Sequence, residues 1–165
     1  MMYPLPTVLL ASLRYSLRKE DYRLQTAKPL GYETGNMALE TLDPNPVWVA
    51  EAYSDTVEVL EGYRDEVTYK IWGGDWCKDC RAKLPDFGAA LAAAGVSDGH
   101  IEEYELDQDK QGPGVEEYDI EFIPTVVVER DGEEIARFVE DEPVPIAVYL
   151  ADKLEEALGP PNQAR

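Results

Sequence analysis

The sequence has few of the residues that mark several common classes of protein. Its 165 residues include one histidine and two cysteines, and 15 lysines and arginines stand against 34 aspartates and glutamates. No apolar run approaches the ~18 residues that a membrane-spanning helix requires. The formal net charge of −19 would repel the phosphates of nucleic acids and of anionic lipids. We therefore expect neither a nucleic-acid partner nor a membrane partner.

The acidic residues form no single tail, because most of them are scattered between Glu33 and Glu156. A dispersed excess indicates that the whole surface is acidic. Our hypothesis is a halophilic protein from a cytoplasm with very high salt, where screening suppresses the self-repulsion of the charge. The alternative is an ordinary acidic protein. Hydrophobic residues make up 44% of the chain, which is enough to bury a core in one domain with an extension.

Residues 1–43 differ in composition from the rest. They hold five of the first seven basic residues, whereas the remainder is strongly acidic. The basic residues Arg14, Arg18 and Lys19 follow the apolar stretch at residues 8–13 instead of preceding it, so we predict no signal peptide and a cytoplasmic protein. We assign residues 1–43 to an N-terminal extension, partly helical or disordered, and residues 44–165 to one domain.

Two explanations of the extension remain open. A partly helical arm around Leu9–Leu24 would pack on the domain or on a partner. Alternatively, the natural chain starts at Met37 and the preceding residues come from a misassigned start.

From residue 43 onward the pattern predicts alternating helices and strands. Asn45 followed by Pro46 is a plausible helix start, and apolar residues at helical spacing continue to Gly62, although residues 47–53 could form an edge strand. Strands are predicted at 67–72, 101–106, 125–129 and 134–139, with a hairpin turn at Asp131-Gly132. Helices are predicted at 77–94, with Pro85 as a kink, and at 146–158, with a loop and short helix at 112–118. This order predicts an α/β fold with a mixed β-sheet covered by helices.

Both cysteines lie in the motif Trp76-Cys77-Lys78-Asp79-Cys80. Their spacing at a helix start places both sulfurs on one side, close enough for a disulfide after modest adjustment. Unpaired N–H groups and the helix dipole favour a thiolate at Cys77, and the thiolate is the attacking form. Cys80 could then resolve a mixed disulfide.

Other sites fit the sequence less well. Zinc usually requires four ligands, and His100 is the sole histidine, expected to be a solvated loop residue, so we expect no metal. A purely structural disulfide in so short a loop would stabilise little. Residues 107–112 begin like a calcium loop, but Tyr118 occupies the twelfth position, where that loop needs glutamate.

These features together resemble the thioredoxin family over roughly Val47 to Leu158. The resemblance rests on a strand followed by Trp76 and the two cysteines, on Pro85 eight residues after Cys77, and on Ile123-Pro124-Thr125 before a hairpin strand. It implies a thioredoxin-like fold in which Cys77 is the nucleophile and Cys80 the resolving thiol. It also implies that Pro124 is a cis proline, and that Trp76, Ile123, Pro124 and Thr125 form the substrate-docking surface.

The chain departs from the family pattern at three places. Lys78-Asp79 replaces the common Gly-Pro, so Lys78 and Arg81 should favour the thiolate and Asp75 and Asp79 should oppose it. The family's buried aspartate and its lysine partner fall at Ile71 and Glu103. A glycine after the last strand is replaced around Val139-Glu140. The aspartate before the second cysteine is similar to that of thioredoxin-related proteins with a Trp-Cys-x-Asp-Cys motif, which often serve narrower substrate sets.

We therefore expect a monomeric thiol–disulfide oxidoreductase that reduces protein disulfides without a bound cofactor. Its partners would be disulfide-containing proteins and a reductase or small thiol that supplies electrons. One rival is a redox partner of narrow specificity, for example for a peroxidase. The other is a non-catalytic adaptor that uses the same fold.

Overall fold

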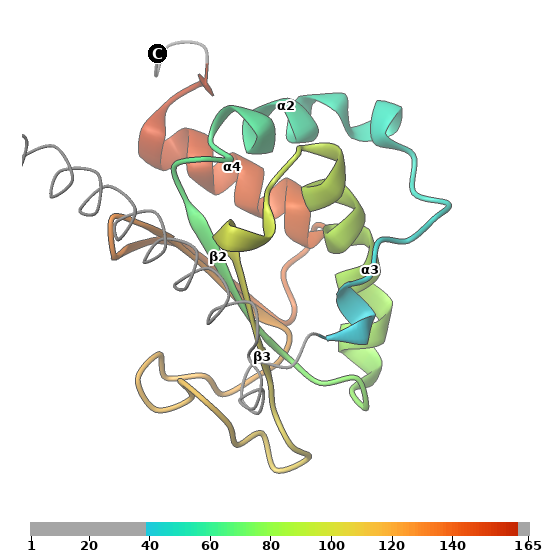
Figure 1. Cartoon of the computed structure of the whole chain (residues 1–165), viewed down its shortest axis with the longest axis vertical. Helices are drawn as coiled ribbons and strands as arrows, with labels where there is room; N and C mark the ends of the chain where they lie inside the picture. Colours follow the sequence, from blue (N-terminus) through green and yellow to red (C-terminus); the bar gives the residue numbers. More distant parts are fainter. Residues whose placement is uncertain (1–38, 162–165) are drawn as a thin grey trace, which may run out of the picture. The chain divides into compact units, whose positions relative to one another are not determined.

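The structure is a computed structural model that describes residues 39–161 (Figure 1). The chain divides into two units, residues 1–35 and residues 36–165. The predicted arm around Leu9–Leu24 and the alternative start at Met37 both lie outside the described residues.

A four-stranded mixed sheet forms the centre of the described unit, as the sequence predicts. Its strands are β2 (Thr68–Gly73), β3 (Ile101–Glu105), β4 (Thr125–Arg130) and β5 (Glu133–Val139), in the order β3-β2-β4-β5. β2 pairs parallel with β3 and antiparallel with β4, and β4 pairs antiparallel with β5. The hairpin turn lies at Asp131-Gly132, where both residues have positive φ.

Within residues 39–161, three α-helices flank the sheet: α2 (Ser54–Gly62), α3 (Lys78–Ala93) and α4 (Ile146–Leu158). Three short 3-10 helices accompany them: η1 (Glu40–Leu42), η2 (Ala50–Tyr53) and η3 (Asp98–His100). α3 contains Pro85 and stops where Gly95 takes φ +75°, a left-handed conformation that few side chains adopt. α4 begins and ends at the predicted residues.

The structure differs from the prediction in two connecting segments. Residues 47–53 form no strand, and the helix predicted to start after Asn45 begins at Ala50. The Asn45 side chain accepts the Val47 N–H and donates to the Asp86 carboxylate at 2.7 Å, so it fixes a turn against α3. Residues 112–118 form turns without the predicted short helix.

The core joins the helices to one sheet face through aromatic pairs. Tyr69 of β2 packs edge-on against Phe87 of α3, and Phe138 of β5 packs against Tyr149 of α4. In Figure 1, α2 lies beside α4, and these two helices are in contact. α3, whose first turn follows Cys77, packs on this face of the sheet.

The core also extends before residue 44, where the sequence places the start of the domain. Leu39 and Leu42 are 1% and 8% exposed and belong to the same apolar cluster as the sheet. η1 packs closely on α3, because a Cβ at Gly88 would overlap the Leu42 carbonyl oxygen. His100 also differs from the expected solvated residue, since its Nδ1 lies 2.8 Å from the Val67 carbonyl oxygen and the side chain is half-buried.

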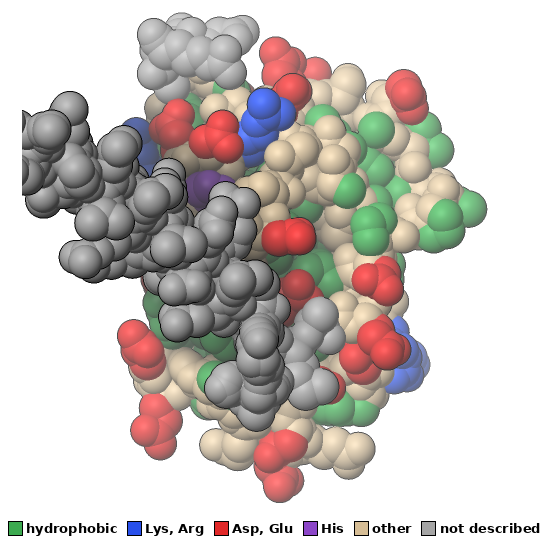
Figure 2. Space-filling view, viewed as in Figure 1, with side chains coloured by type: hydrophobic (Ala, Val, Ile, Leu, Met, Phe, Trp, Pro, Cys, Tyr) green, Lys and Arg blue, Asp and Glu red, His purple; other side chains and the backbone are tan. Residues whose placement is uncertain are grey.

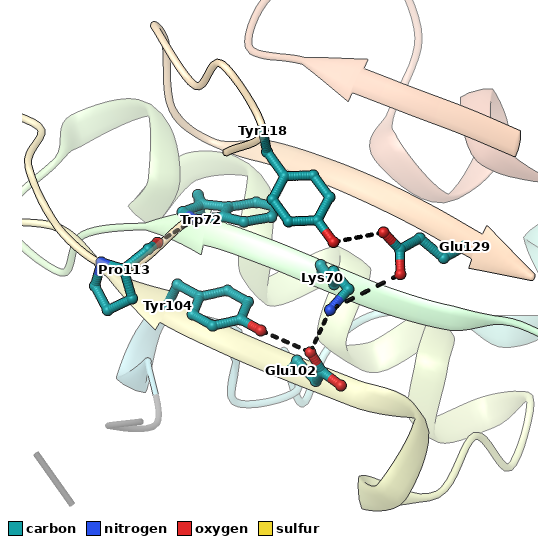
Figure 3. A network of polar contacts seen from close by, with 7 residues as sticks. All are labelled: Lys70, Trp72, Glu102, Tyr104, Pro113, Tyr118 and Glu129. Atoms are coloured by element: carbon teal, nitrogen blue, oxygen red, sulfur yellow. Dashed lines mark hydrogen bonds and ion pairs between the residues drawn. The ribbon is translucent and has the colours of Figure 1, made fainter. Parts of the chain in front are cut away.

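The opposite sheet face is linked to residues 106–124 by a polar and aromatic network (Figure 3). Lys70 lies 2.7 Å from Glu102 and 3.8 Å from Glu129. Burial alone would lower the pKa of Lys70, but the hydrogen bond to Glu102 and the charges of Tyr104, Glu102 and Tyr118 together outweigh it and raise the pKa. Tyr118 donates to Glu129 at 2.6 Å, and Trp72 Nε1 donates to the carbonyl of Pro113. The network fixes the segment that leads into Ile123.

Among residues 39–161, no helix is both long enough and apolar enough to cross a membrane.

Candidate active site

Cys77 stands at the entrance to α3. It is the N-terminal capping residue of the helix, with extended backbone angles of φ −84° and ψ 127°, and its side chain is half-buried. Its N–H donates to the Gly74 carbonyl at 3.0 Å, which closes the turn between β2 and the helix. The Cys77 thiol is therefore held where the first helical N–H groups have no partner within the helix.

Cys80 lies behind Cys77 and is fully buried. Burial raises the pKa of the Cys80 thiol to about 12. A backbone hydrogen bond at Gly74 lowers this pKa, whereas Cys77 and the charge of Asp79 raise it further. Both cysteines are free thiols in the structure. The pair thus combines an accessible thiol with a buried thiol that keeps its proton at neutral pH.

The Ile123–Pro124 peptide bond is cis and faces Cys77. Cys77 Sγ lies 4.0 Å from the Ile123 carbonyl oxygen, which joins residues that are far apart in the sequence. Ile123, Pro124 and Thr125 are themselves buried, and Thr125 Oγ1 donates to the Phe122 carbonyl at 2.6 Å. Phe122 is 46% exposed and lies directly before this segment. Phe122 is not among the predicted site residues, although an aromatic residue before Ile-Pro-Thr is a visible signal.

Trp76 is half-buried beside the thiols. Its Nε1 donates to the Leu106 carbonyl at 2.8 Å, and its ring lies against Gly74. Trp76 therefore ties the loop that carries Cys77 to the end of β3.

The charged residues predicted to tune the thiolate occupy different environments. Lys78 is exposed, whereas Asp79 is half-buried and its charge raises the pKa of Cys80. Arg81 Nη1 donates to the backbone carbonyl of Asp75 at 3.0 Å. The Asp75 carboxylate accepts backbone N–H groups of η1, from Thr41 at 3.0 Å and from Glu40 at 3.2 Å. Asp75 thus anchors η1, which the sequence did not predict to be part of the site.

Leu39 fills the space beside the buried thiol. A Cβ added at Gly73 would lie 3.3 Å from Cys80 Sγ and 3.4 Å from Leu39 Cδ1, so both side chains border the same point of β2. The Leu39 N–H donates to Glu103 Oε1 at 2.7 Å. Ile71, which stands opposite Glu103 in the sheet register, is fully buried.

Glu103 is a half-buried carboxylate. Burial raises its pKa, and the negative charges of Asp43, Asp98 and Asp75 raise it further, whereas the hydrogen bond from Leu39 lowers it. By the resemblance, the family's aspartate and lysine fall at Ile71 and Glu103. These positions therefore hold an apolar side chain and a carboxylate that accepts the Leu39 N–H.

The loop after β5 borders the cis proline. Glu140 has φ +33°, and its N–H donates to the Pro124 carbonyl at 2.8 Å. Its own carbonyl accepts a hydrogen bond from Lys83 Nζ on α3. Glu140, in the stretch Val139-Glu140 where the resemblance places a glycine, is thus bonded both to the cis-proline segment and to α3.

The loop at residues 107–112 is organised by its own first carboxylate. Asp107 Oδ1 accepts the N–H groups of Asp109 and Gln111, each at 2.9 Å. Across residues 39–161, no group of three His, Cys, Asp or Glu side chains is arranged to hold a metal ion.

A family model matches more than half of the chain. Residues 46–151 match the family model described as thioredoxin. No curated protein matches the chain.

Solved structures with a similar fold include several thioredoxins. The thioredoxin of Fasciola hepatica is 19% identical, with a TM-score of 0.42, over 64% of this chain and 93% of that one. Mitochondrial thioredoxin 3 of Saccharomyces cerevisiae is 14% identical, with a TM-score of 0.41, over 64% and 88%. A mutant thioredoxin of Halobacterium salinarum NRC-1 is 18% identical, with a TM-score of 0.38, over 73% and 95%.

Proposed function

Because this chain belongs to the thioredoxin family, we propose that it is a thiol–disulfide oxidoreductase that reduces protein disulfides through Cys77 and Cys80. The observation that carries the proposal is the pairing of a half-exposed Cys77, at the start of α3 and 4.0 Å from the Ile123 carbonyl, with a fully buried Cys80. One thiol can meet a protein substrate, and the other can react only with its neighbour.

The first step is attack by the Cys77 thiolate on one sulfur of the substrate disulfide. The substrate S–S bond breaks, its second sulfur leaves as a thiolate that takes up a proton, and Cys77 becomes joined to the substrate in a mixed disulfide. The Ile123 carbonyl oxygen lies 4.0 Å from the Cys77 sulfur. We propose that this carbonyl aligns an extended substrate segment.

The second step is attack by Cys80 on the Cys77 sulfur. Cys80 loses its proton, the mixed disulfide breaks, and the substrate leaves with its second thiol, while Cys77 and Cys80 become a disulfide. The high pKa of Cys80 supports this order, because a protonated thiol does not compete for the first attack. A reductase or small thiol would then return both cysteines to the reduced form.

A narrow substrate range is a second candidate. Glu140 donates its N–H to the Pro124 carbonyl, and Asp141 and Glu142 follow it, so three consecutive acidic residues belong to a loop that is bonded to the cis-proline segment. Such a surface favours partners with basic residues near the disulfide. Turnover of one basic partner with poor turnover of a neutral protein disulfide would favour this candidate.

The test compares two serine variants with the unmodified chain. This chain should accelerate the reduction of a protein disulfide by dithiothreitol, and Cys77→Ser should abolish that acceleration. Cys80→Ser should accumulate a mixed disulfide that mass spectrometry detects and dithiothreitol releases. Full activity in Cys77→Ser would disprove the mechanism. Cysteine variants that still support the function of the protein in cells would favour the adaptor instead.

A further inference from the structure

A groove opens between α3, the segment before α2, and the loop that leads into α4. Its volume is about 260 Å³, and its lining includes Trp48, Tyr53, Ala82, Asp86, Val144 and Ile146. The rings of Trp48 and Tyr53 stack at 5.2 Å and nearly parallel, which gives the groove a flat aromatic wall. None of the residues assigned to the thiol chemistry lines it.

One exposed apolar side chain, Val144, lines this groove, and two others adjoin the groove residue Trp48 in the sequence. Within residues 39–161, the exposed large hydrophobic side chains are Val47, Val49, Phe122 and Val144. Val47 and Val49 flank Trp48 and are 77% and 53% exposed, and Val144 lines the groove. Figure 2 shows hydrophobic side chains at the right edge of the molecule, over the segment between η1 and η2. An apolar patch with a polar rim is typical of a protein interaction site.

Hydrogen bonds link a residue that lines the groove to the cis-proline segment near Cys77. Lys83 lines the groove and donates to the carbonyl of Glu140. Glu140 in turn donates its N–H to the carbonyl of Pro124. A substrate segment held at the cis-proline loop would therefore lie beside the groove.

We propose that this groove binds a large apolar side chain of the disulfide-bearing polypeptide that reacts with Cys77. The proposal rests on the proposed function. Covalent attachment at Cys77 raises the effective concentration of the rest of the substrate, so a shallow groove suffices to select among substrates. A second copy of the chain is a poorer occupant, because each copy carries a net charge of −19.

The length of α3 between Cys77 and the groove predicts how many residues separate the bound apolar side chain of the substrate from the substrate cysteine. Ala82 and Asp86 follow Cys77 by five and nine residues, which corresponds to roughly 7 to 14 Å along a helix. An extended peptide advances about 3.3 Å per residue. The apolar side chain should therefore lie about two to four residues from the substrate cysteine. The carboxylates of Asp86 and Glu142 on the rim favour basic residues beside it.

The test uses peptides that carry one cysteine in a disulfide with 2-mercaptoethanol. A single tryptophan is placed one to seven residues from the cysteine on either side. The full-length Cys80→Ser protein is mixed with each peptide, and mass spectrometry of quenched samples gives the rate at which Cys77 captures the peptide. We expect tryptophan at two to four residues to raise this rate about tenfold over tryptophan at seven residues.

Three variants in the Cys80→Ser background locate the effect. Ala82→Asp places a charge in the groove, and Val144→Ser removes an exposed apolar wall without burying anything new. Both should abolish the dependence on tryptophan position. Ala93→Asp adds the same charge to an exposed position of α3 outside the groove and should preserve the dependence. The disulfide of 2-mercaptoethanol alone should react equally with all of these proteins.

The outcomes separate the groove from the thiol chemistry. Capture of every peptide at one rate, or a position dependence that survives Ala82→Asp and Val144→Ser, would overturn the groove and leave the proposed function intact. Absence of reaction with any disulfide would overturn both. A dimer of the unmodified chain that Ala82→Asp dissociates would assign the groove to a second copy. Increased proteolysis within residues 1–38 of Ala82→Asp would assign it to the chain's own N-terminal segment.

Discussion

The carboxylate of Asp75 accepts the backbone N–H of Thr41 at 3.0 Å, which joins the loop before Cys77 to the first described turn of the chain. The same carboxylate accepts the N–H of Glu40 at 3.2 Å. Asp75 therefore satisfies two N–H groups at the start of η1, as a capping side chain does at the start of a helix. It does so from a position two residues before the proposed nucleophile.

Asp75→Ala should lower the free energy of unfolding by about 1 kcal/mol, the cost of removing a capping side chain. Asp75→Asn keeps one oxygen acceptor and should lose less. Urea unfolding measures both variants. Hydrogen exchange should speed up at the Thr41 amide in the alanine variant. If Asp75→Ala unfolds at the same urea concentration as the unmodified chain, the two hydrogen bonds contribute no stability.

Gly88→Ala should destabilise the protein, although glycine-to-alanine changes inside helices normally stabilise by about 1 kcal/mol. The added Cβ would overlap the Leu42 carbonyl oxygen, so the backbone of η1 must move away from α3. We expect a loss of about 2 kcal/mol. Gly99→Ala is the matched control, because a Cβ there meets only Ser97 Oγ at 3.9 Å. Equal stability of the two alanine variants would contradict the close packing of η1.

Features with a local signal were predictable from the sequence. The Asp131-Gly132 turn fixes the β4–β5 hairpin, and the apolar period of α4 sets its bounds. The two thiols and Pro124 were placed by short motifs, and the structure gives Pro124 the expected cis bond. The predicted hairpin, α4 and cis bond are confirmed, and each depends on residues close together in the chain.

The contacts of η1 were not predictable in the same way. Thr41 and Asp75 lie 34 positions apart, and Leu39 and Glu103 lie 64 apart, so no periodicity links them. Asn45 carried a valid helix-start signal, but its side chain bonds Asp86 across the fold instead. In each case a tertiary hydrogen bond decides the local structure.

Resolution of the mixed disulfide should depend steeply on pH. Burial raises the pKa of Cys80 to about 12, so its thiolate fraction should rise about tenfold for each pH unit between pH 7 and 9. Stopped-flow release of a fluorescent peptide from the preformed mixed disulfide measures this step. A rate independent of pH would contradict deprotonation of Cys80 as the controlling event.

A pair of charge variants checks the same step. The charge of Asp79 raises the pKa of Cys80, so Asp79→Asn lowers that pKa, increases the thiolate fraction and should accelerate release at every pH in that range. Asp55→Asn removes one charge from an exposed position of α2 and should leave the rate unchanged. Equal rates in the two variants would show that Asp79 does not act on Cys80.

Glu103→Gln should stabilise the protein at pH 7. Burial raises the pKa of Glu103 in the folded protein. Its favourable contribution to the free energy of unfolding is therefore complete below the unfolded pKa of about 4.3, and it is lost as the pH rises through the folded pKa. Glutamine still accepts the Leu39 N–H without a charge. Because the side chain is only half-buried, we expect a gain of about 2 °C in melting temperature at pH 7, and none at pH 4.

Glu102→Gln is the matched control with the opposite sign. Burial raises the pKa of Glu102, but the hydrogen bonds from Lys70 and Tyr104 outweigh it and lower the pKa. Its stabilising contribution is therefore present above the unfolded pKa and lost as the pH falls through the folded pKa. Glu102→Gln should melt at a lower temperature than the unmodified chain at pH 7. The same shift in both glutamine variants would contradict these assignments.

Potassium chloride should raise the melting temperature. The net charge of −19 is spread over the chain, and acidic side chains are scattered over the described face in Figure 2. Screening shortens the reach of their repulsion from about 10 Å at 0.1 M salt to about 3 Å at 1 M. Most of the gain should therefore appear below 1 M, whereas a gain that grows linearly to 3 M would indicate a solvent effect on apolar burial. A melting temperature that does not rise between 0.05 and 2 M would exclude the halophilic hypothesis.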